Sequence, residues 1–187
     1  MILLLLGTAL FAAVHFIPSL APTIKAAWVE RLGENGYKGI FSLLLLAALA
    51  MIITGWRSAT PVFLYNPPAI LHPIALGLLV IAFALLVISN RASRLRRLIR
   101  HPQLTAVALW GIAHLLVNGD SRSLVLFAGM SLWAMGEIIA INRREGVWIK
   151  DATVPPWHTE GITLIIVAIL VAVVIAAHPW LAGVPVM

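Results

Sequence analysis

Six apolar runs, each close to the length of a membrane span, are the feature that most limits how this chain can fold. They cover approximately residues 1–17, 38–56, 70–89, 102–118, 122–141 and 161–181. A helix needs about 20 apolar residues to cross the hydrocarbon core of a bilayer, and about 17 is the lower limit. A helix also satisfies its own backbone hydrogen bonds in lipid. We therefore expect one domain, residues 1–187, folded as an all-α integral membrane bundle of about six transmembrane helices.

The composition excludes other classes of protein. Hydrophobic residues make up 61% of the chain and charged residues 11%, against about 45–50% and about a quarter in soluble domains. A soluble globular domain, a disordered chain and a disulfide scaffold are excluded, the last because there is no cysteine. The net charge of +6 would suggest nucleic-acid binding in a soluble protein. Here the basic residues lie in short loops between apolar runs, so no nucleic acid is expected.

The loop charges predict the orientation. No Lys or Arg precedes the first run, so we interpret it as an uncleaved anchor with the N-terminus outside rather than a signal peptide. Eleven basic residues then fall in the inner loops and two, Arg57 and Arg122, in the outer loops. This bias predicts an N-out/C-out multi-pass protein of the inner (plasma) membrane. The inner residues are Lys25, Arg31, Lys38, Arg91, Arg94, Arg96, Arg97, Arg100, Arg143, Arg144 and Lys150.

Histidines are the most informative polar residues, because without cysteine any metal site must use other ligands. His114 lies about 12 residues into the fourth run, ~18 Å from its inner end, and shares a helix face with Trp110, Gly111 and Asn118. An ionisable residue at this depth is a candidate functional group. The missing side chain of Gly111 would let a flat macrocycle approach the helix. Alternatively, Gly111 serves close helix packing and His114 bonds a neighbouring helix.

The other histidines lie nearer the membrane surfaces. His15 is expected near the inner end of the first run, and His101 at the headgroup level before the fourth. His72 and His178 are expected near the outer face, and His158 in solvent.

One carboxylate is embedded in a run. Glu137 either reaches the surface or pairs with Arg143 or Arg144. Glu30 and Glu34 are expected to form a solvated charge network with Arg31 and Lys38. The Asn-Gly-Asp sequence at 118–120 is typical of a turn.

One stretch resembles the signature of the NnrU family. It comprises Arg100-His101-Pro102-Gln103-Leu104, Leu109-Trp110, Ala113-His114-Leu115-Leu116 and Asn118-Gly119-Asp120, with His15 before it and His178-Pro179 after it. NnrU proteins are associated with nitric-oxide metabolism and denitrification, and resemble the 15-cis-zeta-carotene isomerases, which hold haem b between two histidines. The resemblance implies haem b with His15 and His114 as axial ligands, Gly111 beside the haem, and Arg100 and His101 near its propionates.

Several alternatives stay open. His72 or His178 would match His114 better in depth than His15 does and are alternative ligands. The second function is a haem-dependent cis–trans carotenoid isomerase, so whether the chain is an enzyme is left open. A weaker resemblance of Arg-His-Pro is to isoprenylcysteine methyltransferases, which use S-adenosylmethionine, but Leu104 replaces their tyrosine. The last alternative is an assembly protein without a cofactor. The sequence predicts neither the substrate nor the oligomeric state.

Overall fold

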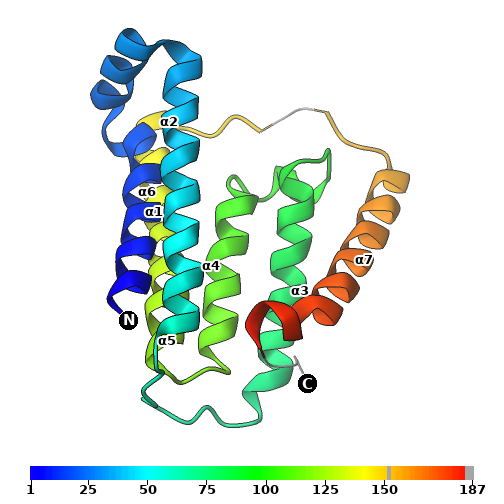
Figure 1. Cartoon of the computed structure of the whole chain (residues 1–187). Coiled ribbons are helices and arrows are strands. Elements are labelled where there is room, and N and C mark those ends of the chain that lie inside the picture. The colour runs from blue at the N-terminus through cyan, green and yellow to red at the C-terminus, as the bar shows by residue number, and fades with distance from the viewer. Residues whose placement is uncertain (151–152, 184–187) are drawn as a thin grey trace.

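The protein is a bundle of helices (Figure 1). The computed structural model describes residues 1–150 and 153–183, and in this part the only β-type pairing is an isolated bridge between Phe63 and Asp120. The elements are α1 (Ile2–Leu20), α2 (Pro22–Ser58), α3 (Leu71–Ser89), η1 (Leu95–Arg97), α4 (Pro102–Leu115), α5 (Ser121–Ser123), η2 (Leu124–Ala128), α6 (Gly129–Glu145) and α7 (Trp157–Ala182).

Five helical segments of the described part are long and apolar enough to cross a membrane: α1, α2, α3, the continuous run from α5 through α6, and α7. Large apolar side chains cover their outer faces; Leu43, Leu132 and Leu164 are each about two-thirds exposed. Exposing so much apolar surface to water would be unfavourable, whereas contact with lipid tails carries no such penalty. The chain is therefore a multi-pass membrane protein, as predicted.

The fourth predicted span is shorter than expected. α4 has 14 residues, which gives it a length of ~21 Å, less than the ~30 Å hydrocarbon core of a bilayer. It nevertheless lies among the longer helices and runs beside them (Figure 1). The structure thus has five helices of membrane length and one shorter helix within the bundle.

Residues 64–65 of the α2–α3 connection, here called the strap, bond the C-terminal end of α4. The hydroxyl of Tyr65 donates to the carbonyls of Leu115 and Asn118, at 2.6 and 3.0 Å. The backbone N–H groups of Leu64 and Tyr65 donate to the Gly119 carbonyl, at 2.8 and 3.1 Å. A Cβ on Gly119 would overlap the Tyr65 carbonyl. The turn lies at residues 116–117 rather than at the predicted 118–120, which form an extended link to α5. Glycine is required at 119 because the Tyr65 backbone of the strap touches this link.

Asp120 ends this link by capping the next helical segment. Its Oδ1 accepts from the backbone N–H groups of Arg122 and Ser123, at 2.9 and 3.1 Å, and its Oδ2 from the Ser123 hydroxyl, at 2.7 Å. Burial works to raise the pKa of the Asp120 carboxyl, but the hydrogen bonds from Ser123 and Arg122 outweigh it and hold the pKa below its ordinary value. The charged carboxylate therefore stabilises the fold.

The two ends of the bundle differ in charge. The α1–α2, α3–α4 and α6–α7 connections, which carry most of the basic residues, lie at one end, at the top of Figure 1. The α2–α3 and α4–α5 connections lie at the other end, as do the N-terminus and the end of α7 (Figure 1). We call these the basic end and the opposite end. The segregation agrees with the loop-charge pattern, and which end faces the cytoplasm stays a prediction.

The first connection at the basic end is helical rather than a loop. α1 continues two residues past Pro18, and α2 already begins at Pro22. Within α2 the backbone leaves helical geometry at Gly33, with φ 71° and ψ 167°, a conformation that glycine adopts without strain. Glu34 and Lys38 form an exposed ion pair of 2.8 Å just beyond it. The predicted solvated charge network is thus confirmed for this pair.

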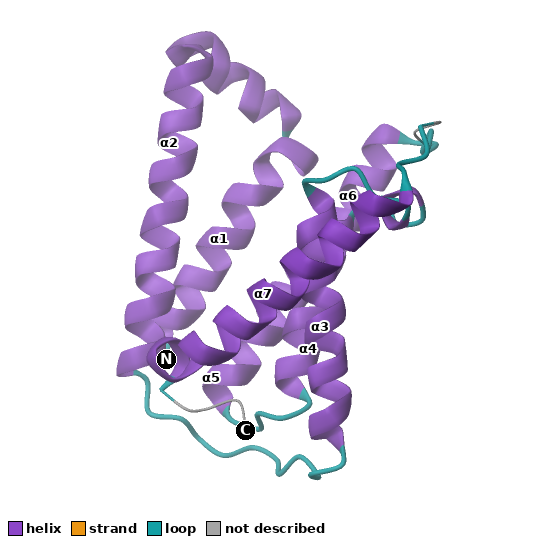
Figure 2. Ribbon diagram, turned by 90° about the vertical axis from the view of Figure 1, so that its right-hand side faces the viewer, coloured by secondary structure: helices purple, strands orange, loops and turns teal. Residues whose placement is uncertain are grey.

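α4 is the central helix of the bundle. On one side it packs with α3 through a cluster of Ala82, Leu85, Ile88 and Ala106. On the other side it packs with α6 and α1 through Ala108, Trp133 and Ala134. α7 packs chiefly against α3 and crosses the bundle at an angle (Figure 2). Any site on α4 is therefore enclosed by helices from both halves of the chain.

Asp120→Ala should lower the free energy of unfolding by about 1 kcal/mol at neutral pH, because the cap of the following helix is lost. Asp120→Asn should keep most of that stability, since asparagine also caps helices. Because the folded-state pKa is depressed, the contribution of the charge is present above the ordinary value near 3.8 and disappears as the pH falls through the folded value. Thermal unfolding in detergent against pH should show the wild type and Asp120→Ala converging in acid. A gap that stays constant in acid would contradict this account.

Candidate functional site

His114 is held in one orientation near the end of α4. Its Nδ1 lies 2.8 Å from the Trp110 carbonyl, and because a carbonyl only accepts, Nδ1 must carry the proton. The ring stacks on Phe127 at 4.3 Å between centroids and an interplanar angle of 20°, and touches Trp110 at 5.0 Å. Nε2, which makes no hydrogen bond within the described part of the chain, keeps its lone pair when the ring is neutral.

The stacking partner of His114 comes from an irregular stretch of helix. Phe127 lies in η2, a π-helical segment between α5 and α6, and such widened turns occur frequently at functional sites. The ring of Phe127 also contacts Trp56 at 5.8 Å, and the Arg122 guanidinium lies 4.7 Å over Trp56. The His114 cluster, which we define as His114, Trp110, Phe127 and Trp56, thus joins three helical segments.

Gly111 serves close packing between α4 and α6. A Cβ at this position would overlap the hydroxyl oxygen of Ser131 and the carbonyl oxygen of Phe127. The Ser131 hydroxyl itself donates to the Ala108 carbonyl at 3.1 Å. Of the two interpretations of Gly111, the structure supports packing against α6, because this side of α4 is filled by protein.

His15 has the same local geometry on α1. Its Nδ1 lies 2.9 Å from the Phe11 carbonyl, so this ring too presents Nε2. It contacts Phe11 at 4.2 Å, Trp133 at 4.8 Å and Phe41 at 5.6 Å. We call these four residues the His15 cluster. It shares no residue with the His114 cluster, although each includes an aromatic residue of the continuous η2–α6 segment.

The two histidines lie at different depths but incline toward each other. His15 is level with Trp133 and His114 with Phe127, which are six residues, or ~9 Å, apart along a helix. α1 and α4 run in opposite directions (Figure 1). Helical side chains lean toward the N-terminus of their own helix, and both imidazoles do so, because each bonds the carbonyl four residues earlier. Each imidazole therefore leans toward the level of the other, and the ~9 Å between the two levels is an offset of the rings themselves.

His178, His72 and His158 lie in two kinds of environment. His178 on α7 is partly buried and lies close enough to His114 for the charges of the two rings to interact. His72 is exposed and bonds the Ala69 carbonyl at 3.1 Å. His158 is exposed, as predicted. Of the two alternative ligands, His178 is thus the one that the structure brings near His114.

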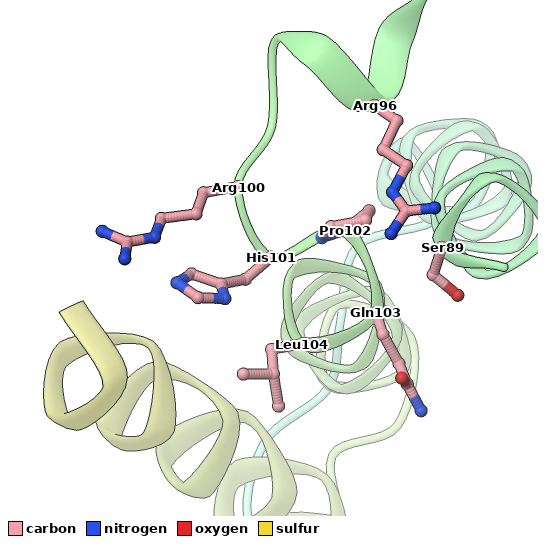
Figure 3. A pocket seen from close by; sticks show the side chains of 7 residues that line it. All are labelled: Ser89, Arg96, Arg100, His101, Pro102, Gln103 and Leu104. Atoms are coloured by element: carbon pink, nitrogen blue, oxygen red, sulfur yellow. The ribbon is translucent and has the colours of Figure 1, made fainter. Parts of the chain in front are cut away.

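Arg100 and His101 bind the end of α6. The Arg100 guanidinium donates to the Gly146 carbonyl at 2.7 Å and to Glu145 at 3.2 Å, and the Nε2 of His101 lies 2.9 Å from the Asn142 Oδ1. Figure 3 shows both side chains pointing from the start of α4 toward α6. They lie 13 residues or more before His114, or ~20 Å along the helix. Their observed role is to tie α4 to α6 at the basic end.

Glu137 and Trp133 are a pair whose environment the sequence did not reveal. Glu137 is only 4% exposed and Trp133 8%. Within the described residues, the Oε1 of Glu137 and the Nε1 of Trp133 are buried without a hydrogen-bond partner. Neither expectation for Glu137 is met in the described part of the chain. Its low exposure excludes the surface, and no ion pair with Arg143 or Arg144 is found there, since Arg144 donates to Glu145 and to the Pro18 carbonyl.

The donor set of the described residues is limited. No group of three or more histidine, aspartate or glutamate side chains among them could hold a bare metal ion. A haem needs less from the protein, because its macrocycle supplies four ligands and the chain supplies one or two. The NnrU protein family model matches residues 3–186. The chain belongs to the NnrU family. No curated protein and no solved structure is significantly similar to this NnrU-family chain.

Gly111→Ala should destabilise the protein by about 1–3 kcal/mol, the usual cost of overpacking, because its methyl group would collide with Ser131 and Phe127. Gly77→Ala on α3 is the matched control, since nothing lies within 4 Å of its Cβ position; it should be neutral or slightly stabilising. Thermal unfolding of both variants measures the difference. Equal behaviour of the two variants would show that α4 and α6 are not in close contact at Gly111.

Glu137→Leu should leave the thermal stability unchanged or raise it. The substitution removes a buried polar atom that has no partner and replaces it with an apolar side chain of similar length. Glu34→Leu in the exposed ion pair is a control for the loss of a carboxylate. A fall of several degrees specific to Glu137→Leu would contradict the absence of a partner for the Glu137 carboxyl.

Proposed function

We propose that this NnrU-family chain binds haem b in the inner (plasma) membrane through His15 and His114 and acts in nitric-oxide or denitrification metabolism. The observation that supports haem most directly is the state of the two imidazoles. In each, a backbone carbonyl fixes the protonated Nδ1, which leaves the Nε2 lone pair as a ligand. Histidines that bind metals are typically oriented in this way by a second hydrogen bond.

The surroundings of both histidines fit a haem. The rings beside them are aromatic, and the helices that carry them are apolar on most faces. The two imidazoles lean toward each other from α1 and α4, which supports their holding one haem rather than two.

Haem b, when bound, would supply an iron centre that exchanges electrons and takes small ligands such as nitric oxide. The chain's own residues would hold this iron centre and determine its surroundings. His15 and His114 hold their rings by the Nδ1 bonds, Phe127 stacks on His114, and Trp133 contacts His15. Apolar neighbours exclude water, which strengthens the electrostatic influence of every nearby charge on the centre.

His178 is the alternative partner for His114, because it lies within electrostatic range of that ring. In that arrangement the centre would lie toward the opposite end of the bundle, and His15 would keep only its packing role. Single substitutions separate the two ligand pairs.

The test is the absorption spectrum of detergent-purified protein, oxidised and dithionite-reduced, for the wild type, His15→Ala, His114→Ala, His178→Ala and His158→Ala. The wild type should show a Soret band and the sharp α and β bands of six-coordinate haem. These sharp bands should be lost in the His15 and His114 variants and kept in the His178 variant and in the exposed control His158→Ala. Loss in His178→Ala with retention in His15→Ala would overturn the proposed pair, and a wild type without a Soret band after haem reconstitution would overturn haem binding.

The metabolic part needs a separate experiment. Because a haem held by two histidines has no free position, nitric oxide added to the reduced protein would have to replace one of them, and this replacement should shift the Soret band. The gene's deletion should change nitric-oxide accumulation during growth on nitrate. Turnover of a cis-carotenoid without any response to nitric oxide would favour the isomerase instead.

A further inference from the structure

The five arginines between Arg91 and Arg100 are not equivalent. The Arg94 guanidinium stacks on Trp157 at 4.0 Å and donates to the Pro155 carbonyl at 3.0 Å. Arg100 is committed to Glu145 and Gly146 at the end of α6. Both guanidinium groups thus have partners within the protein, and they hold the connections at the basic end together.

Arg96 is different, because it lines a cavity and makes no hydrogen bond or ion pair with the residues that the structure describes. The open cavity has a volume of about 220 Å³. Figure 3 shows Arg96 extending from η1 to the side of α4 on which Ser89 and Gln103 lie, while Arg100 and His101 point the other way. The lining residues are Ser89, Arg96, Arg100, His101, Pro102, Gln103 and Leu104.

The chemistry of this cavity suits an anion. Its lining contains Arg96 and Arg100 and neither aspartate nor glutamate. Arg100 is already bonded to Glu145 and Gly146, so the exposed Arg96 is the arginine that remains for an anion. The first backbone bond of α4 runs from Thr105 to the His101 carbonyl, at 2.9 Å, so the N–H groups of Gln103 and Leu104 have no acceptor within the helix. The Ser89 hydroxyl already donates to the Leu86 carbonyl at 2.6 Å, so its proton is not free for a ligand, and the residue only lines the cavity. Arg96 and the free N–H groups are thus the donors for an oxyanion such as phosphate.

The position of the cavity favours a lipid headgroup over free phosphate as the bound group. It lies where α3 ends and α4 begins, at the basic end of a membrane bundle, which is the level of lipid headgroups. The same connection exposes two leucines, Leu95 at 50% and Leu98 at 68%, which favours its insertion among lipids. The loop charges predict that this end faces the cytoplasm, where basic pockets between transmembrane helices are suited to anionic headgroups.

We propose that this cavity binds the headgroup phosphate of an anionic phospholipid, with Arg96 as its main charged partner. The acyl chains would continue along the outward-facing apolar surface of the bundle. The site requires neither haem nor any ligand of His15 or His114. Its test is therefore independent of the test of the proposed function.

The experiment counts the lipids that stay bound. The full chain is placed in nanodiscs of zwitterionic phosphatidylcholine with a minor share of phosphatidylglycerol, released, and examined by native mass spectrometry. The wild type should retain phosphatidylglycerol well above its share. Arg96→Gln should reduce that retention roughly tenfold, since it removes one charge-assisted contact. Arg31→Gln removes one charge from an exposed residue of the α1–α2 connection at the same end and should change nothing.

Each remaining outcome overturns the proposal. Equal loss in Arg96→Gln and Arg31→Gln would mean that total charge, not this cavity, attracts the lipid. No enrichment in the wild type would mean that no site exists. Displacement of the lipid by millimolar inorganic phosphate would assign the cavity to free phosphate instead. Thermal unfolding checks that the variants fold, and if Arg96→Gln does not, Arg96→Met, which keeps a long side chain without the charge, must show the same loss.

Discussion

The close contact of α4 with α6 is the constraint on which the rest of the structure depends. At Gly111 the two helices approach so closely that a single methyl group would collide with Ser131 and with the Phe127 backbone. In lipid there is no hydrophobic force between helices, so packing of this kind and interhelical hydrogen bonds must hold them. The Ser131–Ala108 bond supplies one at 3.1 Å. Because α4 is short, this contact and the ties at its two ends fix where His114 lies.

The same contact explains why two aromatic–histidine clusters lie side by side. The η2–α6 segment contributes Phe127 to the first and Trp133 to the second, so its register determines the offset between His114 and His15. The buried carboxyl of Glu137, one turn beyond Trp133, has an oxygen without a partner among the residues that the structure describes. Such a group costs stability wherever it is kept in hydrocarbon, and its position on the helix that joins both clusters makes it a residue to examine together with them.

Much of this architecture could be predicted, because span length and loop charge are local, additive properties of the sequence. The positions of the apolar runs, the grouping of the basic loops and the depth of His114 follow from them. What escaped prediction depends on contacts between distant residues. Tyr65 ends α4 from 50 residues away, Arg100 meets Glu145, and His178 comes near His114 only after α7 has folded back over the bundle. No local pattern encodes such contacts.

The ligation of iron by two imidazoles is the central claim, and electron paramagnetic resonance of the oxidised wild-type protein tests it most directly. A ferric haem held by two neutral imidazoles would give a low-spin signal that differs from the high-spin signal of a haem with one protein ligand. The account predicts the low-spin signal in the wild type, converted to high-spin in His114→Ala. A wild-type protein that is high-spin when loaded with haem, or that holds no haem, would contradict it.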